Sequence, residues 1–244
     1  MASLSAEKTV SEVEPELTVV IPVFNEQARI GHRLSELEAL VSTGSVEVIV
    51  VDGGSRDATV PIAESFSFCR VLRAPRGRAS QMNAGARAAR GRTLLFLHAD
   101  VSPPRDALDW IRGALDEPGV VAGAFRTQTV SDGEHRRSAP WLRLADLRSR
   151  FTTLPYGDQA IFLRRETFFE VGGFPDLPLM EDLELSLRLR RLGRMRVVSA
   201  SVRVSGRRFL THPLRDTLLV NVFPLLYRLG VPAEKLARLY RDVR

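Results

Sequence analysis

The chain of 244 residues is poor in cysteine and in long apolar runs. Its single cysteine, Cys69, cannot form a disulfide within the chain, which favours a reducing compartment and leads us to expect a cytoplasmic protein. No run reaches the roughly 20 apolar residues that a membrane-spanning helix needs. The nearest candidate, Leu218–Leu229, is short and is interrupted by Asn221, Pro224 and Arg228. We therefore predict no membrane span.

Lysine is scarce too: Lys8 and Lys235 are the only two, so the net charge of +6 rests on arginine. Arginine suits the oxygens of phosphate and diphosphate groups, although a compositional bias of the genome would enrich it equally. The basic residues are scattered and no zinc-finger or RNP signature accompanies them, so we expect no nucleic-acid partner. Two phosphate-binding motifs, G-x-G-x-x-G after the first strand and G-x-x-x-x-G-K-[ST], are also absent. Dinucleotide and P-loop sites therefore lose their main support.

Apolar strands and amphipathic helices alternate through the first half of the chain. Strands are predicted at 17–24, 46–51, 69–73 and 93–98, and helices at 30–40, 58–66 and 80–89. This alternation predicts a mostly parallel, Rossmann-like α/β sheet built from right-handed βαβ units. The pattern continues with further helices at 105–116, 141–151, 165–171 and 181–192, strands at 120–129, 159–163 and 196–204, and two helices within 213–243.

The domain organisation follows from the same pattern. The polar, acidic residues 1–16 have no apolar signal core, and we expect a disordered tail there. Residues 17–210 are predicted to form one α/β domain, and residues 211–244 a C-terminal helical extension packed on it.

Three carboxylates stand at the ends of predicted strands: Glu26, Asp52 and Asp100. Each alone could cap the next helix, and Asp100 could cap 105–116. Because the carboxyl ends of parallel strands share one edge of a sheet, three acids there indicate a ligand site. Carboxylate oxygens suit Mg²⁺ or Mn²⁺. We expect Asp100 to hold such an ion, with His98 as a further ligand or a neighbour of one.

Six motifs together resemble family 2 glycosyltransferases of the GT-A fold: V-V-I-P-V-F-N-E, V-D-G-G-S-R-D, G-R-A-S-Q-M-N-A-G, F-L-H-A-D, G-D-Q-A-I-F-L-R and M-E-D-L-E-L-S-L-R-L-R. The resemblance runs in register from about Leu17 to Gly206. It is strongest to a bacterial subfamily of small, stand-alone members that are often labelled arsenosugar-biosynthesis glycosyltransferases. It implies transfer of a sugar from a nucleoside-diphosphate sugar to an acceptor, with a divalent cation as cofactor.

The resemblance also implies roles on the nucleotide side. Pro22 and Glu26 would line the nucleotide, and Asp52 would accept a hydrogen bond from the imide N–H of a uracil-like base. Arg78 and Asn83 would approach the base and the diphosphate. Asp100 would be the surviving aspartate of the family's D-x-D motif and would coordinate the metal, whereas His98 replaces the first aspartate.

Further roles concern the donor sugar and the acceptor. Gly157, Asp158 and Gln159 would form a turn that touches the donor sugar. The Glu181–Asp182 pair would be catalytic, with Asp182 as the general base, although such pairs also cap helices. Arg207 would fold over the diphosphate as part of a closing loop, unless it lies in a solvated basic turn.

These assignments predict a metal-dependent, inverting glycosyltransferase that uses a UDP-sugar and an acceptor hydroxyl on a small molecule or a lipid-linked compound. One alternative is a nucleotidyltransferase acting on sugar phosphates, although Asn25-Glu26-Gln27 replaces the basic loop that it would need after the first strand. The other is a non-catalytic nucleotide-sugar-binding protein, which would not need Glu181-Asp182. The apolar, arginine-bearing segments 141–151 and 218–240 either cover the sheet or meet a membrane surface peripherally.

Overall fold

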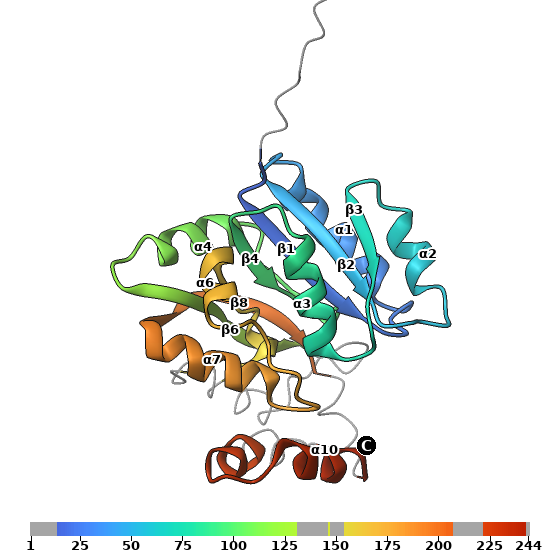
Figure 1. Ribbon diagram of the computed structural model, residues 1–244. Coiled ribbons are helices and arrows are strands. Elements are labelled where there is room, and N and C mark those ends of the chain that lie inside the picture. Colours follow the sequence, from blue (N-terminus) through green and yellow to red (C-terminus); the bar gives the residue numbers. More distant parts are fainter. Residues whose placement is uncertain (1–13, 131–145, 147–153, 207–221, 243–244) are drawn as a thin grey trace, which may run out of the picture.

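A computed structural model describes residues 14–130, 146, 154–206 and 222–242 of the chain (Figure 1). Eight strands form one sheet in the order β3-β2-β1-β4-β7-β6-β8-β5. The strands are β1 (Leu17–Val23), β2 (Val46–Asp52), β3 (Cys69–Arg73), β4 (Thr93–Phe96), β5 (Val101–Ser102), β6 (Val120–Val130), β7 (Phe162–Arg164) and β8 (Arg194–Ser205). The helices are α1 (Ile30–Val41), α2 (Thr59–Glu64), α3 (Arg78–Ala88), α4 (Ala107–Leu115), the 3₁₀ turn η1 (Gly157–Gln159), α6 (Arg165–Glu170), α7 (Glu181–Leu192) and α10 (Ala233–Asp242).

The sheet is parallel in the first half of the chain and mixed in the second. Neighbours within β3-β2-β1-β4 are parallel, as the alternating pattern predicts. β7 is antiparallel to β4 and to β6, and β5 is antiparallel to β8. β7 is antiparallel to β4 because the chain enters β7 from η1, and η1 lies beside the carboxyl end of β4. β6 and β8 are parallel, so four of the seven pairings are parallel and the prediction of a mostly parallel sheet is confirmed, with the antiparallel pairings confined to β5 and β7.

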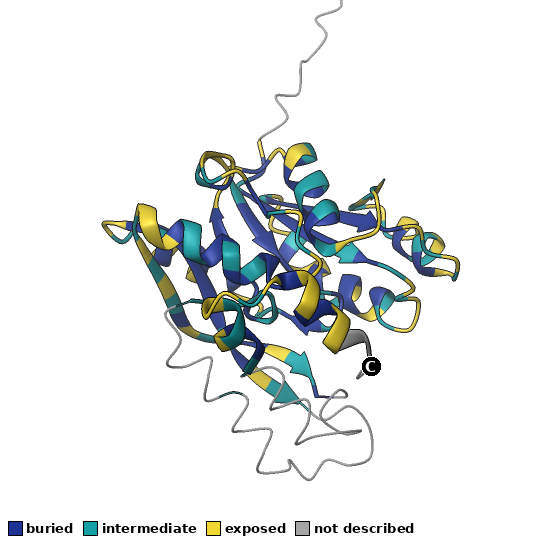
Figure 2. Cartoon of the chain, turned by 60° about the horizontal axis from the view of Figure 1, so that its bottom comes forward, coloured by how far each residue is buried: buried dark blue, intermediate teal, exposed yellow. Residues whose placement is uncertain are grey.

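Two apolar layers hold helices on opposite faces of the sheet. One layer joins α1, α2 and α4 to the sheet through residues such as Leu34, Ala63 and Ile111. The other joins α3, α6 and α7 through residues such as Met82, Phe168 and Leu185. In Figure 2 the central strands are coloured as buried, whereas β3 and β8 also carry exposed residues. Burial on both faces explains why β1, β2 and β4 are mostly apolar in the sequence and do not alternate between apolar and polar residues.

Several expected boundaries differ from those of the structure. The strand expected at 159–163 is instead the 3₁₀ turn η1 followed by β7, because Ala160 adopts a left-handed conformation that ends extended pairing. α3 begins at Arg78, two residues before Ser80, and β4 ends at Phe96, two residues before His98. Apart from Asp146, the helix expected at 141–151 lies outside the described residues.

The start of the fold lies within the expected tail. The backbone N–H of Glu16 donates to the Ser45 carbonyl, and the Glu16 carbonyl accepts from the N–H of Thr93. The Glu16 carboxylate also pairs with Arg112 at 2.5 Å. Residues 1–13 lie outside the described part of the chain.

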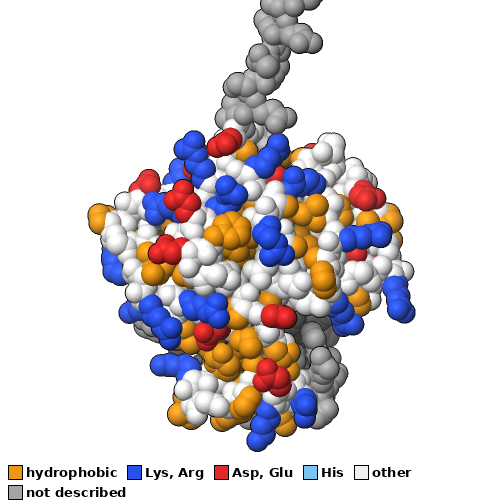
Figure 3. Space-filling model, viewed as in Figure 1, with side chains coloured by type: hydrophobic (Ala, Val, Ile, Leu, Met, Phe, Trp, Pro, Cys, Tyr) orange, Lys and Arg blue, Asp and Glu red, His pale blue; other side chains and the backbone are white. Residues whose placement is uncertain are grey.

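The described C-terminal helices, residues 222–228 and α10, pack beneath α7. Their Phe223 and Leu236 are buried against Met180 and Leu183 at the start of α7. Figure 3 shows apolar side chains gathered between α7 and α10. Tyr227 adds a hydrogen bond between the helix at 222–228 and α7, because its hydroxyl donates to the Glu184 carboxylate at 3.2 Å. Within the described residues, no helix is both long and apolar enough to cross a bilayer.

Candidate functional site

The carboxyl ends of β1, β2 and β3 lie side by side at one edge of the sheet. The register pairs Val23 with Asp52, the last residues of β1 and β2. The two loops that follow are joined to each other: the Asn25 N–H donates to Ser55 Oγ at 2.8 Å, and the Glu26 N–H donates to Thr59 Oγ1 at 2.7 Å. Glu26, expected near the ribose, therefore lies at the same edge as Asp52.

Two of the expected nucleotide-side acids already have partners within the chain. Asp52 is only 1% exposed, and its carboxylate accepts hydrogen bonds from the N–H groups of Gly54 and Ser55 at 3.0 Å. Glu26 pairs with Arg29 at 2.6 Å and remains partly exposed. Pro22, half-buried in β1, lies opposite Val51 of β2.

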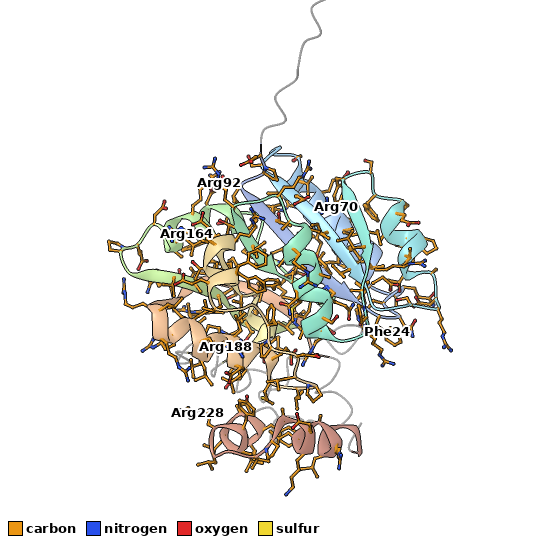
Figure 4. All side chains as sticks on the ribbon, in the orientation of Figure 1. Phe24, Arg70, Arg92, Arg164, Arg188 and Arg228 are labelled. Carbon is orange, nitrogen blue, oxygen red and sulfur yellow. The ribbon has the colours of Figure 1, made fainter. Side chains whose placement is uncertain are left out.

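A basic and aromatic contact borders the same edge. The Arg76 guanidinium stacks on the Phe24 ring at 3.9 Å, just beyond the end of β1 (Figure 4). Neither residue belongs to the predicted set. Both residues follow strands, the first and the third, and this position in the sequence could have marked them as candidates for the site.

The loop that carries His98 and Asp100 rests on a buried arginine that the sequence pattern did not single out. Arg33 of α1 donates to the Ala99 carbonyl at 3.3 Å and to Ser102 Oγ at 2.5 Å. Burial lowers the pKa of Arg33, and the nearby carboxylates of Glu36 and Asp100 oppose that effect. The sequence signal for the buried position of Arg33 is its place on the apolar face of α1, one residue before Leu34.

His98, Gly157 and Asp182 converge beside the end of β4. The Gly157 N–H donates to Asp182 Oδ2 at 2.6 Å, and the Leu183 N–H donates to Asp182 Oδ1 at 2.7 Å. A Cβ placed on Gly157 would lie 2.8 Å from His98 Nε2 and 3.2 Å from Asp182 Oδ2. The expected general base, the expected sugar-side turn and the residue that replaces an aspartate thus meet in one place.

Glu181 is engaged with Arg78. Arg78 Nε lies 2.7 Å from Glu181 Oε1 in an ion pair, and Arg78 Nη2 donates a hydrogen bond to Oε2 at 3.2 Å; the contact joins the first residues of α3 and α7. Glu181 is 2% exposed, so burial raises the pKa of its carboxyl; the charge of Asp182 adds to this shift and the Arg78 guanidinium opposes it.

Other predicted residues lie nearby with side chains bonded to backbone. Gln159 is fully buried: its amide donates to the Phe125 carbonyl at 3.1 Å and its Oε1 accepts from the Tyr156 N–H at 3.2 Å. Asn83 makes two hydrogen bonds with the backbone of Phe174, at 2.8 and 3.0 Å. Asp158 lies in η1 between Gly157 and Gln159. Arg207 lies outside the described residues.

Backbone strain is concentrated around the site. In the described part of the chain, three residues other than glycine have positive φ: Asn25 at 54°, Ala160 at 50° and Met180 at 69°. They follow β1, follow η1 and precede Glu181, respectively. Such conformations persist only where the surroundings impose them, and they are frequent at ligand sites.

The described residues contain no group of three or more His, Cys, Asp or Glu side chains arranged to hold a metal ion. Asp100 and the neighbouring His98 supply at most two ligands. This small donor set still fits Mg²⁺ or Mn²⁺, because such ions in phosphate-binding sites take one or two carboxylates and complete their shell with phosphate oxygens and water. Cys69 is not a candidate ligand or nucleophile, since burial raises the pKa of its thiol to about 11.

A comparison with known protein families shows to which family the chain belongs. The family described as glycosyl transferase family 2 matches residues 18–173, which include every strand end at the site. The chain belongs to glycosyl transferase family 2.

Curated family 2 relatives share moderate identity over part of their length. A probable glycosyltransferase YdaM of Bacillus subtilis is 27% identical over 211 residues, covering 73% of this chain and 47% of the relative. A dolichyl-phosphate β-glucosyltransferase of Drosophila melanogaster is 39% identical over 133 residues, covering 48% of this chain and 40% of that protein. A pre-mycofactocin glycosyltransferase of Mycobacterium tuberculosis is 30% identical over 200 residues, covering 73% and 40%. The chain thus spans less than half the length of each.

Solved structures support the fold. A mannosyltransferase from Pyrobaculum calidifontis, in complex with GDP-mannose and Mn²⁺, superposes with a TM-score of 0.68 at 22% identity, covering 93% of this chain and 70% of that one. Residues 1–349 of TarS from S. aureus, in complex with UDP-GlcNAc, give 0.59 at 20% identity, covering 78% and 58%. The mixed sheet with helices on both faces is the GT-A fold, as the motifs predict.

Proposed function

We propose that this family 2 protein is an inverting glycosyltransferase that moves a sugar from a nucleoside-diphosphate sugar, with UDP as the expected nucleotide, to an acceptor hydroxyl. The observation that carries the proposal is the convergence of Asp182, Gly157 and His98 at the sheet edge where Glu26 and Asp52 also lie. A nucleotide at the ends of β1 and β2 would bring its diphosphate and sugar towards the end of β4, where Asp182 lies.

The chemistry assigns one role to Asp182. Its carboxylate takes the proton of the acceptor hydroxyl as that oxygen attacks the anomeric carbon. The bond from that carbon to the diphosphate breaks, and its electron pair leaves with the diphosphate. A single displacement inverts the anomeric configuration. The N–H groups of Gly157 and Leu183 hold the two carboxylate oxygens in place, which orients the base before the acceptor arrives.

Asp100 and His98 are the proposed ligands of a divalent cation, Mg²⁺ or Mn²⁺. When bound, such an ion would neutralise charge on the departing diphosphate. The cation in the Pyrobaculum mannosyltransferase supports this role, although the ion preferred by the present protein is a prediction.

On the nucleotide side we propose Pro22, Glu26 and Asp52 as the residues that line the base and the ribose. Arg126 of β6, whose strand is separated from β1 by β4 and β7, is a further candidate for contact with an anion: its Nε is buried and makes no hydrogen bond within the described residues. A buried guanidinium N–H without a partner is costly, and a bound anion would satisfy it. Arg207 stays a prediction for closure over the diphosphate.

On the sugar side, we propose that Gly157 and Asp158 contact the donor. The Gln159 and Asn83 side chains already form hydrogen bonds to the backbone, so we assign them the structural role of fixing the loops around the site.

The proposal is tested with a thermal-shift panel of UDP-, GDP- and dTDP-sugars, with and without Mn²⁺, followed by an assay of UDP release with candidate acceptors. We expect a UDP-sugar to raise the melting temperature more in the presence of Mn²⁺. Asp182→Asn, with Asp176→Asn as a matched control in the preceding loop, is expected to bind the donor but to lose turnover. If no nucleotide stabilises the protein, or Asp182→Asn turns over normally, the proposal fails.

The same assays address two other functions. A nucleotidyltransferase would form a nucleotide-sugar and pyrophosphate from a sugar phosphate and a nucleoside triphosphate. A non-catalytic sensor would bind the donor and release no UDP with any acceptor. We favour transfer over sensing because Asp182 is held by two N–H groups beside the sugar-side turn, an arrangement that binding alone does not require.

Contact with a lipid surface is proposed for the C-terminal helices. Their inner residues pack on α7, but Leu225 and Leu229 are 56% and 73% exposed, close in the chain to the exposed cations Arg228 and Lys235. Exposed leucines flanked by cations are typical of helices that lie on anionic bilayers. Two relatives are named for dolichyl-phosphate and undecaprenyl-phosphate substrates, which agrees with a lipid-linked acceptor.

Flotation with liposomes containing anionic lipid tests this contact. We expect binding by the wild type, loss in the double variant Leu225→Glu/Leu229→Glu, and no loss in Leu192→Glu, which alters an exposed leucine at the end of α7. A wild type that does not float, or a double variant that does, contradicts the proposal. A small-molecule acceptor of the kind suggested by the arsenosugar subfamily would then be favoured, and the protein would be a cytoplasmic enzyme without a membrane contact.

A further inference from the structure

Three side chains on the first two turns of α3 connect segments that are far apart in the sequence. Gln81 donates to the carbonyls of Val23 at 2.8 Å and Val51 at 2.7 Å, at the ends of β1 and β2. Asn83 holds Phe174, and Arg78 holds Glu181 at the start of α7. One rigid helix thus links the strands beneath the proposed nucleotide site to the loop and helix that carry Asp182. In Figure 1 the lower end of α3 lies beside the start of α7.

The Arg78–Glu181 contact has the geometry of a structural pair. An ion-pair contact to one carboxylate oxygen and a hydrogen bond to the other fix both the distance and the orientation of the two planar groups. Glu181 is almost fully buried, whereas Arg78 is partly exposed. A buried carboxylate needs a fixed partner, and an edge of the guanidinium that could bind two diphosphate oxygens is occupied by Glu181.

Glu181 is well placed to control Asp182. It is the first residue of α7, directly before Asp182 and directly after Met180, whose φ is +69°. A methionine in this conformation is strained and stays there only if its neighbours are held. The Arg78–Glu181 pair holds the following residue, and the Asn83–Phe174 bonds hold the preceding loop. Releasing Glu181 would let the first turn of α7 relax and would move the Asp182 carboxylate away from Gly157.

We infer that Arg78 and Glu181 are positioning residues that set the distance between the nucleotide half of the sheet and the base Asp182. This inference rests on the proposed function, and it replaces the role of Arg78 as a donor ligand and of Glu181 as a catalytic residue.

The two roles of Arg78 predict different kinetics. As a positioning residue, its loss lowers the turnover number and leaves UDP affinity unchanged. As a donor ligand, its loss weakens UDP binding. Glu181 discriminates further, because a buried acidic residue is not a ligand for a diphosphate and can affect turnover only through the residues that it holds in place. Loss of a positioning pair must therefore give the same defect from either side.

The experiment compares Arg78→Ala, Glu181→Gln, their double variant and Arg78→Lys by UDP calorimetry and by UDP release from the donor selected in the thermal-shift panel. We expect each single alanine or glutamine variant to lose turnover about tenfold or more, with a UDP dissociation constant within about twofold of wild type. The double variant should be no slower than the slower single variant, and Arg78→Lys should recover part of the turnover. Arg87→Ala, an exposed charge deletion on the same helix, should behave as wild type.

Several outcomes would overturn the inference. A UDP affinity weakened tenfold or more by Arg78→Ala but not by Glu181→Gln would restore Arg78 as a donor ligand, and additive losses of turnover would deny the coupling. If Arg78→Ala does not fold, Glu181→Gln and Arg78→Lys decide through the same two measurements. If the wild type neither binds UDP nor releases it, the proposed function itself is refuted. The wild type is therefore measured before any variant is compared with it.

Discussion

Replacing Gly157 by alanine separates stability from activity at the proposed site. The new Cβ would approach His98 Nε2 to 2.8 Å and Asp182 Oδ2 to 3.2 Å, while the N–H that donates to Asp182 is kept. Both contacted atoms are the ends of side chains, which can rotate away at a cost of about 0.5–1.5 kcal/mol per displaced group. The fold should therefore survive with a slightly lower melting temperature.

Activity should respond much more strongly to the same change. A general base displaced by about 1 Å can cost about a hundredfold in rate, so turnover of Gly157→Ala should fall by that order while UDP affinity is retained. Gly113→Ala is the matched control: no atom lies within 4 Å of its added Cβ, and alanine in α4 should gain up to about 1 kcal/mol. Thermal unfolding, UDP calorimetry and UDP release on both variants make the comparison. A Gly157→Ala protein with wild-type turnover would show that Asp182 and His98 do not act at the reacting centre.

Three further outcomes are expected. Gly85→Ala should destabilise the protein by about 1–2 kcal/mol in chemical denaturation despite a better helix former, because its Cβ would lie 2.3 Å from Val20 Cγ1; Val20→Ala should relieve that cost in the double variant. Asp100→Asn should bind UDP equally well with and without Mn²⁺ in calorimetry, whereas the wild type should bind it more tightly with Mn²⁺. Burial holds the pKa of Glu181 above that of an exposed glutamate, so the folded protein keeps a proton that the unfolded chain releases, and the stability from this group falls as pH rises. The unfolding free energy of wild type minus that of Glu181→Gln should accordingly decrease between about pH 4 and pH 7, and a rising difference would contradict the burial argument.

The fold was predictable wherever local pattern and tertiary environment agree. β1 and β2 are apolar because both faces are covered, and α7 has its predicted bounds because the apolar spacing ends at Gly193. Prediction was wrong at 159–163, where an apolar segment read as a strand. There the left-handed Ala160 separates η1 from β7, and Gln159 is drawn inward by hydrogen bonds to the backbone of Phe125 and Tyr156. The long-range bond to Phe125 leaves no periodic signal in the sequence.

The candidate site divides in the same way. That Glu26 and Asp52 share one edge could be anticipated, because strand ends of one sheet meet there. The roles of Asp182 and Gly157 followed only from the family resemblance, and the structure brings both beside His98. The buried support from Arg33 was not predicted: its place on the apolar face of α1 can be read from the sequence, but its partners Ala99 and Ser102 lie 66 and 69 residues away and leave no local signal.

Family motifs preserve both the residues that face a ligand and those that hold the facing residues in place, and a motif match does not separate the two. In this chain Arg78, Gln81 and Asn83 belong to one motif, yet each is bonded to another part of the protein. Loss of activity on mutating them would therefore say little about ligand contact. The informative quantity is how the loss divides between nucleotide affinity and turnover, because only a residue that touches the nucleotide must change the first. If these losses fall on turnover alone, the ligand-facing part of this motif is small, and we expect specificity for the donor to rest chiefly on the loops after β1, β2 and β4.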